Sequence, residues 1–264
     1  MPTSLGAHSP TLDAVRALKT KAGRREQGRF AIEGATMLAE ALRSGEVPSA
    51  VYATPASLES SNAVLSGLDA AVPVYVIPER AMARLSDLET APGILAVLES
   101  RVVALEDLLA GAGPLLLLAG LGDPGNAGTL LRSAEIFGFG GVLFGGDAVE
   151  PYNPKVVRAS MGAIFRVGLA AGSPGEIETA ARAAGYELVA TGEGGRPLPE
   201  FRFRRRSIVA VGNERRGLRG WLSSWDRTVS IPQQGAGESL NAAVAGSIVA
   251  YVAASQMEDP APRP

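Results

Sequence analysis

Residues 115–144 read LLLLAGLGDPGNAGTLLRSAEIFGFGGVLF, and their pattern is the most informative in the chain. An apolar segment comes first, followed by a turn rich in Gly, Asp and Pro, a segment with helical periodicity, and a second apolar segment. This order predicts one β-turn-α-β unit of an α/β domain, with its polar groups gathered at the turn. The turn is therefore where we look first for functional residues.

The composition limits the chemistry that is available to the chain. Its 264 residues include no Cys and a single His. The lack of Cys excludes disulfides, thiolate nucleophiles and Cys-ligated zinc, and His8 alone offers little for acid–base catalysis. The 25 basic and 27 acidic residues give a net charge of −2, so a nucleic-acid site has to come from local basic clusters. We therefore expect no bound metal.

The chain shows no sign of membrane association. No segment offers ~18 uninterrupted apolar residues, and residues 1–10 lack the basic and apolar regions of a signal peptide. We therefore expect a cytoplasmic protein that makes no membrane contact.

The spacing of apolar segments predicts two domains. Residues 1–104 alternate short strands and helices, and residues 114–257 repeat this pattern on a larger scale, which favours a mostly parallel sheet. A linker is expected at 105–113 and a frayed tail at 258–264. The expected strands are 30–33, 50–54, 74–77 and 93–98 in the first domain and 115–119, 141–144, 166–169, 187–191, 207–211 and 228–231 in the second.

Two interpretations fit the glycines of the first turn. Residues 120–125 match the G-x-G-x-x-G pattern of dinucleotide-binding proteins, and Asp147 follows about twenty residues later. However, Asp123 and Pro124 occupy its variable positions, and this pair is a common N-cap and first helical residue. The pattern therefore fits an ordinary capped helix equally well.

Arg132 lies in the helix that is expected after this turn. Leu130, Ala134 and Phe137 make the apolar stripe of that helix, and at about 100° per residue Arg132 lies on the opposite side. It is thus free to face a ligand, although an arginine on a helix surface is more often only solvated.

Two further segments place polar turns after apolar strands. In residues 205–218, RRSIVAVGNERRGL, the strand ends at Gly212, Asn213 and Glu214. In residues 229–253 a strand ends at Ile231, and Ser239 is expected to cap a helix of small residues that suits the core or a dimer interface. Around the first of these segments, seven arginines suit phosphate contacts: Arg202, Arg204, Arg205, Arg206, Arg215, Arg216 and Arg219.

Together these three segments resemble the motifs of the SpoU (TrmH-like) branch of the SPOUT RNA methyltransferases. Residues 156–167 also resemble the family's connecting segment, and residues 19–34 resemble its substrate-binding extension, a small α/β domain similar to ribosomal RNA-binding proteins. The motif positions, in the family's order and at family-like spacing, are Asp123, Pro124, Asn126, Gly128, Arg132 and Ala134, then Gly212, Asn213, Glu214, Gly217 and Leu218, then Ile231, Pro232, Ser239, Leu240 and Asn241.

The resemblance implies an S-adenosylmethionine-dependent enzyme that methylates a ribose 2′-hydroxyl, with ribosomal RNA favoured as substrate. It also implies a trefoil knot in the C-terminal domain and a homodimer with the C-terminal helix at the interface. Carried over position by position, the cofactor contacts are Thr191, Gly192, Gly212, Ile231 and Leu240.

The same resemblance implies a catalytic centre of Arg132, Asn126, Glu214, Ser239 and Asn241. Because a guanidinium keeps its proton in proteins, we expect Arg132 to bind a neighbouring phosphate and to stabilise the developing alkoxide. The proton acceptor stays open between phosphate, water and Arg132. Asn126 is expected to orient Arg132 or the ribose, and Glu214 to fix the loop after its strand or an arginine. Ser239 and Asn241 are expected to shape the pocket around the methyl group.

A basic set near the start of the chain is expected to contact RNA phosphates. Residues 1–29 hold six such residues against only two acidic ones: Arg16, Lys19, Lys21, Arg24, Arg25 and Arg29.

Three alternatives stay open at this point. The first keeps the chemistry and exchanges ribosomal for transfer RNA. The second is an RNA-binding protein without catalytic activity. The third is an NAD-dependent oxidoreductase, which leaves the segments around Glu214 and Asn241 unexplained.

Overall fold

The computed structural model describes residues 2–235 and 239–257, and the chain divides into two compact units. The first unit contains residues 1–101 and 152–165, and the second contains residues 102–151 and 166–264. The predicted tail, 258–264, lies outside the described residues. Within the described part of the chain, no helix is long and apolar enough to span a membrane.

The first unit is built on a five-stranded mixed sheet with the order β1-β4-β3-β5-β2. Strands β1, β4 and β3 pair in parallel, and β5 runs antiparallel to β3 and β2. Its elements are β1 (Thr3–Ser4), α1 (Pro10–Ala17), α2 (Lys21–Gln27), β2 (Arg29–Glu33), α3 (Ala35–Arg43), β3 (Ala50–Ala53), α4 (Pro55–Ser60), α5 (Asn62–Leu65), β4 (Val74–Val76), α6 (Glu79–Leu85), β5 (Ile94–Glu99), α9 (Pro154–Ala159) and the 3-10 turn η1 (Ala163–Phe165).

The second unit is built on a six-stranded sheet with the order β11-β9-β10-β6-β7-β8, in which every pair is parallel. A parallel sheet has to be covered on both faces. Its elements are α7 (Leu105–Leu109), β6 (Leu115–Ala119), α8 (Pro124–Ile136), β7 (Gly141–Gly145), β8 (Gly168–Gly172), α10 (Pro174–Ala183), β9 (Glu187–Pro197), the 3-10 turn η2 (Leu198–Glu200), β10 (Ser207–Gly212), β11 (Arg227–Ser230) and α11 (Ala242–Ser255).

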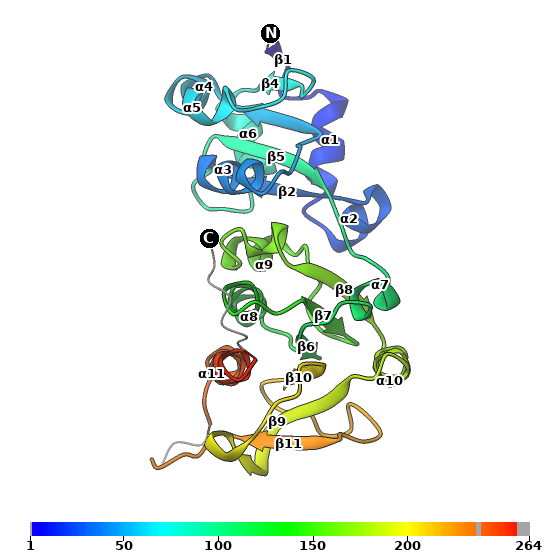
Figure 1. The fold of residues 1–264 in the computed structure, drawn as a ribbon. Helices are drawn as coiled ribbons and strands as arrows, with labels where there is room; N and C mark the ends of the chain where they lie inside the picture. Colours follow the sequence, from blue (N-terminus) through cyan, green and yellow to red (C-terminus); the bar gives the residue numbers. More distant parts are fainter. Residues whose placement is uncertain (1, 236–238, 258–264) are drawn as a thin grey trace. The chain divides into compact units, whose positions relative to one another are not determined.

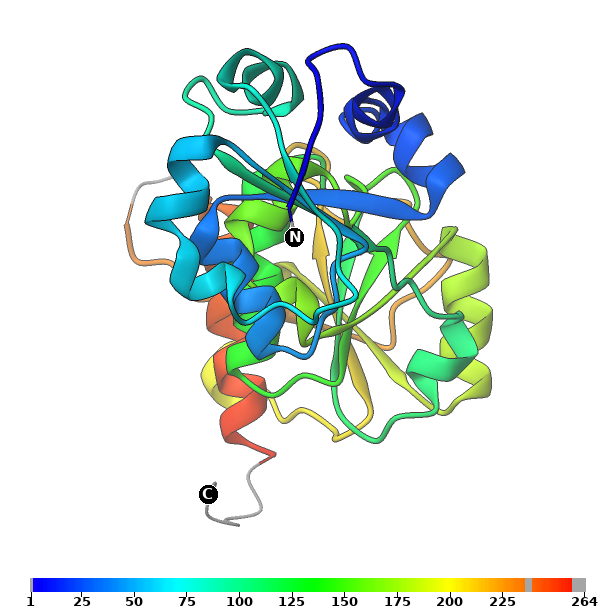
Figure 2. The ribbon, with the colours of Figure 1, turned by 90° about the horizontal axis from the view of Figure 1, so that it is seen from above.

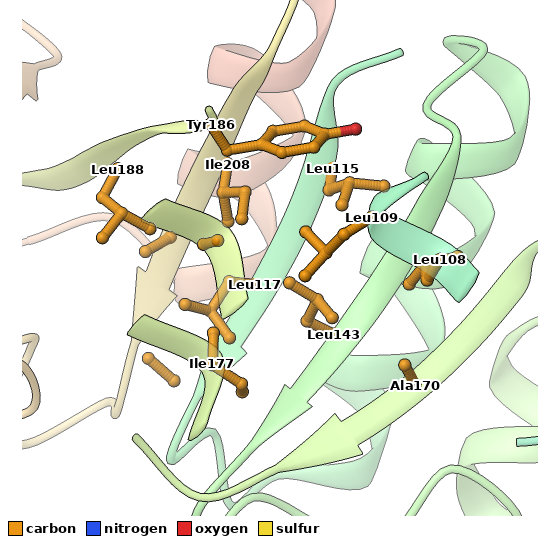
Figure 3. Close-up of a cluster of buried hydrophobic side chains, with 13 residues drawn as sticks. Leu108, Leu109, Leu115, Leu117, Leu143, Ala170, Ile177, Tyr186, Leu188 and Ile208 are labelled. Carbon is orange, nitrogen blue, oxygen red and sulfur yellow. The ribbon is translucent and has the colours of Figure 1, made fainter. Parts of the chain in front are cut away.

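Helices cover both faces of this parallel sheet. Figures 1 and 2 show α7 and α10 on one side and α8 and α11 on the other. On the α7 and α10 side, Leu117, Leu143 and Ile208 form one buried cluster with Ile177 of α10, as Figure 3 shows. The strands are apolar at successive positions because each face has its own layer of helices. The sheet therefore holds the loops at its carboxyl edge on a rigid base.

The sequence predicts these elements closely but misses the short strand β1, and three further differences follow. Each of the ten expected strands overlaps an observed one, and β6 has the expected bounds, so the α/β fold with its parallel sheet is confirmed. The expected linker at 105–113 instead contains α7, which packs against β8 and α10. Residues 152–165 pack with the first unit, where Tyr152 contacts Phe30 at 4.3 Å between ring centroids.

The third difference concerns the start of the last helix. Its N-cap is Asn241 and not Ser239: the Asn241 Oδ1 accepts hydrogen bonds from the backbone N–H groups of Ala243 (2.9 Å) and Val244 (3.2 Å). Asparagine serves this position as well as serine does. The trefoil knot stays a prediction, because the order and direction of the strands do not define how the later loops thread.

Helix α11 packs closely against α8 and β10 at Gly246. A Cβ added to Gly246 would lie 2.6 Å from Leu130 Cδ2 and 2.8 Å from Val211 Cγ2. Both neighbours are buried side chains in a packed core, so they have little room to move.

We expect Gly246→Ala to lower the free energy of unfolding by about 1–3 kcal/mol, because the added methyl overpacks this seam. The matched control is Gly175→Ala in α10, where a Cβ meets nothing within 4 Å. That change should be neutral or stabilising, since alanine favours helices. Urea denaturation measures both variants, and equal effects would contradict the packing argument.

Candidate active site

The motif residues gather at the carboxyl edge of the parallel sheet. Ala119, the last residue of β6, pairs with Gly212, the last residue of β10, so the loops that follow them start side by side. The first loop leads into α8, whose N-cap is Asp123 and whose first residue is Pro124, as the sequence predicted. Loops at the carboxyl ends of strands are the usual ligand sites of α/β sheets.

Asn126 joins three of these loops through its side-chain amide. Its Nδ2 donates to Glu214 Oε1 at 3.1 Å, and its Oδ1 accepts from Asn241 Nδ2 at 2.9 Å. The amide orientation is determined because a carboxylate can only accept. Asn126 is 9% exposed, so both hydrogen bonds are needed to compensate its burial. The network fixes the starts of α8 and α11 to the loop after β10.

Glu214 is ionised in this network and acts as an anchor. Partial burial raises the pKa of its carboxyl, but hydrogen bonds from its own backbone N–H, from Asn126 and from the N–H groups of Asp123 and Gly122 outweigh burial and lower it overall. A carboxylate with a lowered pKa is a poor general base at neutral pH. The geometry therefore agrees with the expectation that Glu214 fixes its loop.

The loop after β10 is closed tightly by Gly212 and Asn213. A Cβ on Gly212 would lie 2.4 Å from the carbonyl carbon of Gly217, so only glycine fits there. The Asn213 Nδ2 donates to the Gly120 carbonyl at 3.0 Å, and its Oδ1 accepts from two N–H groups of its own loop. Asn213 is a motif position to which the sequence alone assigns no role. The structure shows that it ties two strand-end loops together.

Four of the expected cofactor residues lie in or next to the neighbouring strands β9, β10 and β11, with Thr191 and Gly192 inside β9 and not at its end. The Thr191 hydroxyl donates to the Ala210 carbonyl of β10 at 2.8 Å, and Gly192 follows at an exposed position. Ile231 comes directly after β11, and Leu240 precedes the α11 N-cap with 41% of its surface exposed. An exposed leucine and the backbone groups of strand ends are kinds of partner that suit the apolar faces and polar edges of an adenosine group. These residues therefore fit S-adenosylmethionine.

Arg132 and Ser239 stand apart from the hydrogen-bonded network. Arg132 is exposed on α8, and neither a hydrogen bond nor an ion pair joins its guanidinium to any residue that the structure describes. Asn126 uses its amide on Glu214 and Asn241, so it does not orient Arg132 by a hydrogen bond. Ser239 is exposed just before Leu240. Arg132 is thus a cation free for an anionic ligand.

The six basic residues expected to contact RNA differ in their exposure and in their side-chain partners. Lys21 and Arg25 are exposed, and their side chains make no hydrogen bond or ion pair to the described residues. Arg16 and Arg29 are exposed and pair with carboxylates at 2.9 and 3.7 Å. Lys19 is half-buried, and its Nζ donates to the Ser86 carbonyl at 2.6 Å.

Arg24 requires a correction. It is 6% exposed, and its Nη1 donates to the Leu18 carbonyl at 2.7 Å. A guanidinium buried in this way holds the first unit together and does not reach an RNA phosphate.

The seven arginines expected to suit phosphate contacts also differ in whether their side chains already have partners. Arg206 lies over the Tyr186 ring at 4.6 Å and donates to the Leu109 carbonyl. Arg202 donates to the carbonyl of Pro199, and Arg204 lies 3.4 Å from Glu187. These three have partners within the fold, and Arg216 pairs with Asp147 at 3.1 Å. The other three, Arg205, Arg215 and Arg219, are exposed without a side-chain partner among the described residues. Within residues 2–235 and 239–257, no group of three or more His, Asp and Glu residues is placed to hold a metal.

Comparisons with known proteins agree with this geometry. Residues 114–251 match the SpoU rRNA Methylase family, and residues 9–96 match the MRM3-like substrate binding domain. The chain is 29% identical over 242 residues to the 23S rRNA (guanosine(2553)-2′-O)-methyltransferase RlmP of Bacillus subtilis, covering 89% of this chain and 92% of that protein. It is 39% identical over 142 residues to the 23S rRNA (uridine(2479)-2′-O)-methyltransferase of Streptomyces viridochromogenes, where the match spans 51% of this chain and half of that protein.

Solved structures share the whole architecture. The AdoMet-bound rRNA methyltransferase from Sinorhizobium meliloti matches with a TM-score of 0.83 and 25% identity, covering 97% of this chain and 99% of that one. The SpoU methyltransferase AviRb from Streptomyces viridochromogenes, in complex with AdoMet, matches with a TM-score of 0.83 and 28% identity, covering 94% and 98%.

We expect Asn126→Asp to lower the free energy of unfolding at pH 7 by about 1–3 kcal/mol, because it replaces a donor to Glu214 with a second carboxylate. The folded-state pKa of Glu214 is lowered, so its stabilisation is present above the unfolded value of about 4.3 and is lost as pH falls through the folded value. In the variant, protonation of either carboxylate removes their repulsion, so the deficit should shrink as pH falls toward about 4.

Urea denaturation between pH 3.5 and 8 measures this deficit. The matched control is Asn153→Asp at the N-cap of α9, where aspartate caps as well as asparagine does. A deficit at Asn126 that does not change with pH would rule out repulsion between the two carboxylates.

Proposed function

Because this chain belongs to the SpoU rRNA Methylase family, we propose that it transfers the methyl group of S-adenosylmethionine to a ribose 2′-hydroxyl of ribosomal RNA. The observation that carries the proposal is the arrangement of the three motif loops at the carboxyl edge of the parallel sheet, with Asn126, Glu214 and Asn241 hydrogen-bonded and Arg132 left free. We expect it to act in the cytoplasm.

The family match decides between the two interpretations of the glycine-rich turn at residues 120–125. The resemblance to the SpoU branch is confirmed, and with it the methyltransferase class, so the NAD-dependent oxidoreductase loses its support. Ribosomal RNA is favoured over transfer RNA because the two named relatives act on 23S rRNA. The complete motif set argues against an RNA-binding protein without activity.

The chain's own residues prepare the 2′-hydroxyl and the pocket. When bound, S-adenosylmethionine supplies an electrophilic methyl group on a sulfonium. The hydrogen-bonded loops hold the pocket rigid, which favours in-line approach of the attacking oxygen. Arg132 binds the phosphate next to the ribose and stabilises negative charge as the hydroxyl passes its proton to that phosphate or to water. As a guanidinium it keeps its own proton, so its contribution is electrostatic.

Replacing Arg132 tests this role. We expect Arg132→Ala to keep less than about a tenth of the rate of methyl transfer, with cofactor affinity nearly unchanged. Arg132→Lys keeps the charge and should recover part of the rate. Labelled S-adenosylmethionine with ribosomal and transfer RNA transcripts measures transfer, and calorimetry measures cofactor binding. An Arg132→Ala variant at nearly full rate would remove Arg132 from the centre.

The first unit is proposed to bind the RNA. It contains the match to the MRM3-like substrate binding domain, and Lys21 and Arg25 are exposed cations at the two ends of the short helix α2. Both are free to replace the counterions of an RNA backbone.

We expect the double variant Lys21→Ala, Arg25→Ala to weaken RNA binding and to flatten the dependence of log K on log salt by roughly 0.7–0.9 per lost phosphate contact. Cofactor affinity should stay the same. The matched control is Arg43→Ala, an exposed arginine of the same unit that pairs with Glu40. Filter binding at several salt concentrations gives both slopes, and an unchanged slope in the double variant would place the RNA elsewhere.

A homodimer is proposed through the outer face of α11. Val244, Ile248 and Tyr251 follow one exposed stripe of this helix, with 48, 38 and 59% of their surfaces exposed. Ile136 of the neighbouring α8 is 51% exposed, four residues after Arg132. A contiguous apolar surface of this kind is typical of a protein interface. Pairing through it would bring the Arg132 face of α8 close to the second subunit.

We expect Ile248→Asp to convert the dimer to a monomer, because it places an unpaired charge in the apolar interface. The matched control is Val47→Asp, which adds the same charge at an apolar residue of the first unit that is 63% exposed. Sedimentation equilibrium measures both masses. A wild-type chain that sediments as a monomer, or a variant that stays dimeric, would refute this interface.

A further inference from the structure

A hollow of about 320 Å³ lies at the same edge of the sheet, among the ends of β6 and β7 and the loop after β10. Its polar lining includes Asp147, Asn213, Arg216, Arg219 and Trp221. No residue expected to bind the cofactor is part of its described lining. Its size is at the small end of ligand pockets and suits a single nucleobase.

Trp221 presents an unused donor in this hollow. Its ring packs on Gly145, where an added Cβ would lie 2.3 Å from Cζ2, so the side chain has little freedom. Its indole Nε1 is buried and has no hydrogen-bond partner among the residues described. A buried N–H without a partner is rare in folded proteins, and a ligand is one of the few things that explain it.

Asp147 presents an acceptor close to the same spot. Its Oδ2 accepts from Arg216 Nη2 at 3.1 Å. Its Oδ1 faces Gly120: a Cβ on Gly120 would lie 2.6 Å from Asp147 Oδ1 and 3.6 Å from Trp221 Nε1. Gly120 has φ +68°, so glycine is favoured here, and a side chain would collide with Asp147 Oδ1. A donor and an acceptor therefore lie close to the same glycine.

From this geometry we propose that the hollow binds one unpaired nucleobase of the RNA substrate by its Watson–Crick edge, an inference that rests on the proposed function. An unpaired base offers an N–H donor and a ring or carbonyl acceptor side by side, which pair with Asp147 and with the Trp221 indole N–H. Arg219, exposed at the rim, is free to meet the phosphate of the same nucleotide. Sequence-specific RNA recognition commonly takes bases splayed out in this way.

The two tryptophans of the chain, Trp221 and Trp225, allow a direct test. In full-length Trp225→Phe protein labelled with ¹⁵N-tryptophan, one indole N–H signal remains and reports on the hollow. We expect uridine 5′-monophosphate to shift this signal, whereas ribose 5-phosphate does not, because it has no base. The 3-methyl derivative of the nucleotide lacks the N3–H donor and should bind about tenfold more weakly.

A second arm asks whether the RNA uses the hollow. Asp147→Ala removes the acceptor at an exposed side chain, so the fold should be kept, and the KM for RNA should rise about tenfold with kcat nearly unchanged. Asp107→Ala, at an exposed aspartate of α7, is the matched control and should behave as wild type.

The outcomes separate this inference from the proposed function. An indole signal that no nucleotide shifts, or that ribose 5-phosphate shifts equally, would overturn the base site. A KM that Asp147→Ala leaves unchanged would overturn its use by the RNA. A wild-type chain that binds the cofactor and RNA but transfers no methyl group would overturn the proposed function, and the indole titration would still decide whether the hollow binds a base.

Discussion

The buried side-chain amide of Asn126 is the interaction on which the candidate site depends. Its partners, Glu214 and Asn241, are 88 and 115 residues away along the chain. A buried amide that loses either hydrogen bond leaves an unsatisfied polar group, and this cost keeps all three loops in one arrangement. Glu214 is held in its ionised form by the same contacts. The hydrogen-bonded residues of the site are thus the ones that shape it.

Close packing of backbone completes this arrangement. Gly212 has the carbonyl of Gly217 against its α-carbon, and Gly246 lets α11 approach Leu130 and Val211. Side chains at either position would push a loop or a helix away from the sheet. The parallel sheet, covered on both faces, is the rigid base on which these loops and helices are held. The positions of the loops are therefore fixed by strands that supply no functional side chains themselves.

The cationic side chains, in contrast, fall into two groups: some are held inside the fold, and others are left to solvent. Arg24 and Arg206 are held by carbonyl oxygens inside the fold, whereas Arg132, Lys21 and Arg25 have no side-chain partner among the residues described. A guanidinium that is already hydrogen-bonded has few donors left for a phosphate, and a solvated one keeps them all. The distinction separates arginines that stabilise the fold from those available to an anionic ligand. Adjacent residues can differ in this respect: Arg24 is buried, whereas its neighbour Arg25 is exposed.

Local patterns in the sequence were enough to predict the α/β class, ten of the eleven described strands, the cap of α8 at Asp123 and the three motif segments, because apolar period and turn residues are local properties of the chain. Only the folded structure shows that residues 152–165 pack with the first unit, that residues 105–109 form a helix, that Asn241 caps α11 and that Arg24 is buried. It alone also brought Asp147 and Trp221 to one hollow, 74 positions apart in the numbering of the chain. The physical reason is that burial and hydrogen-bond partners depend on contacts between segments far apart in the chain, which no local pattern of residues records.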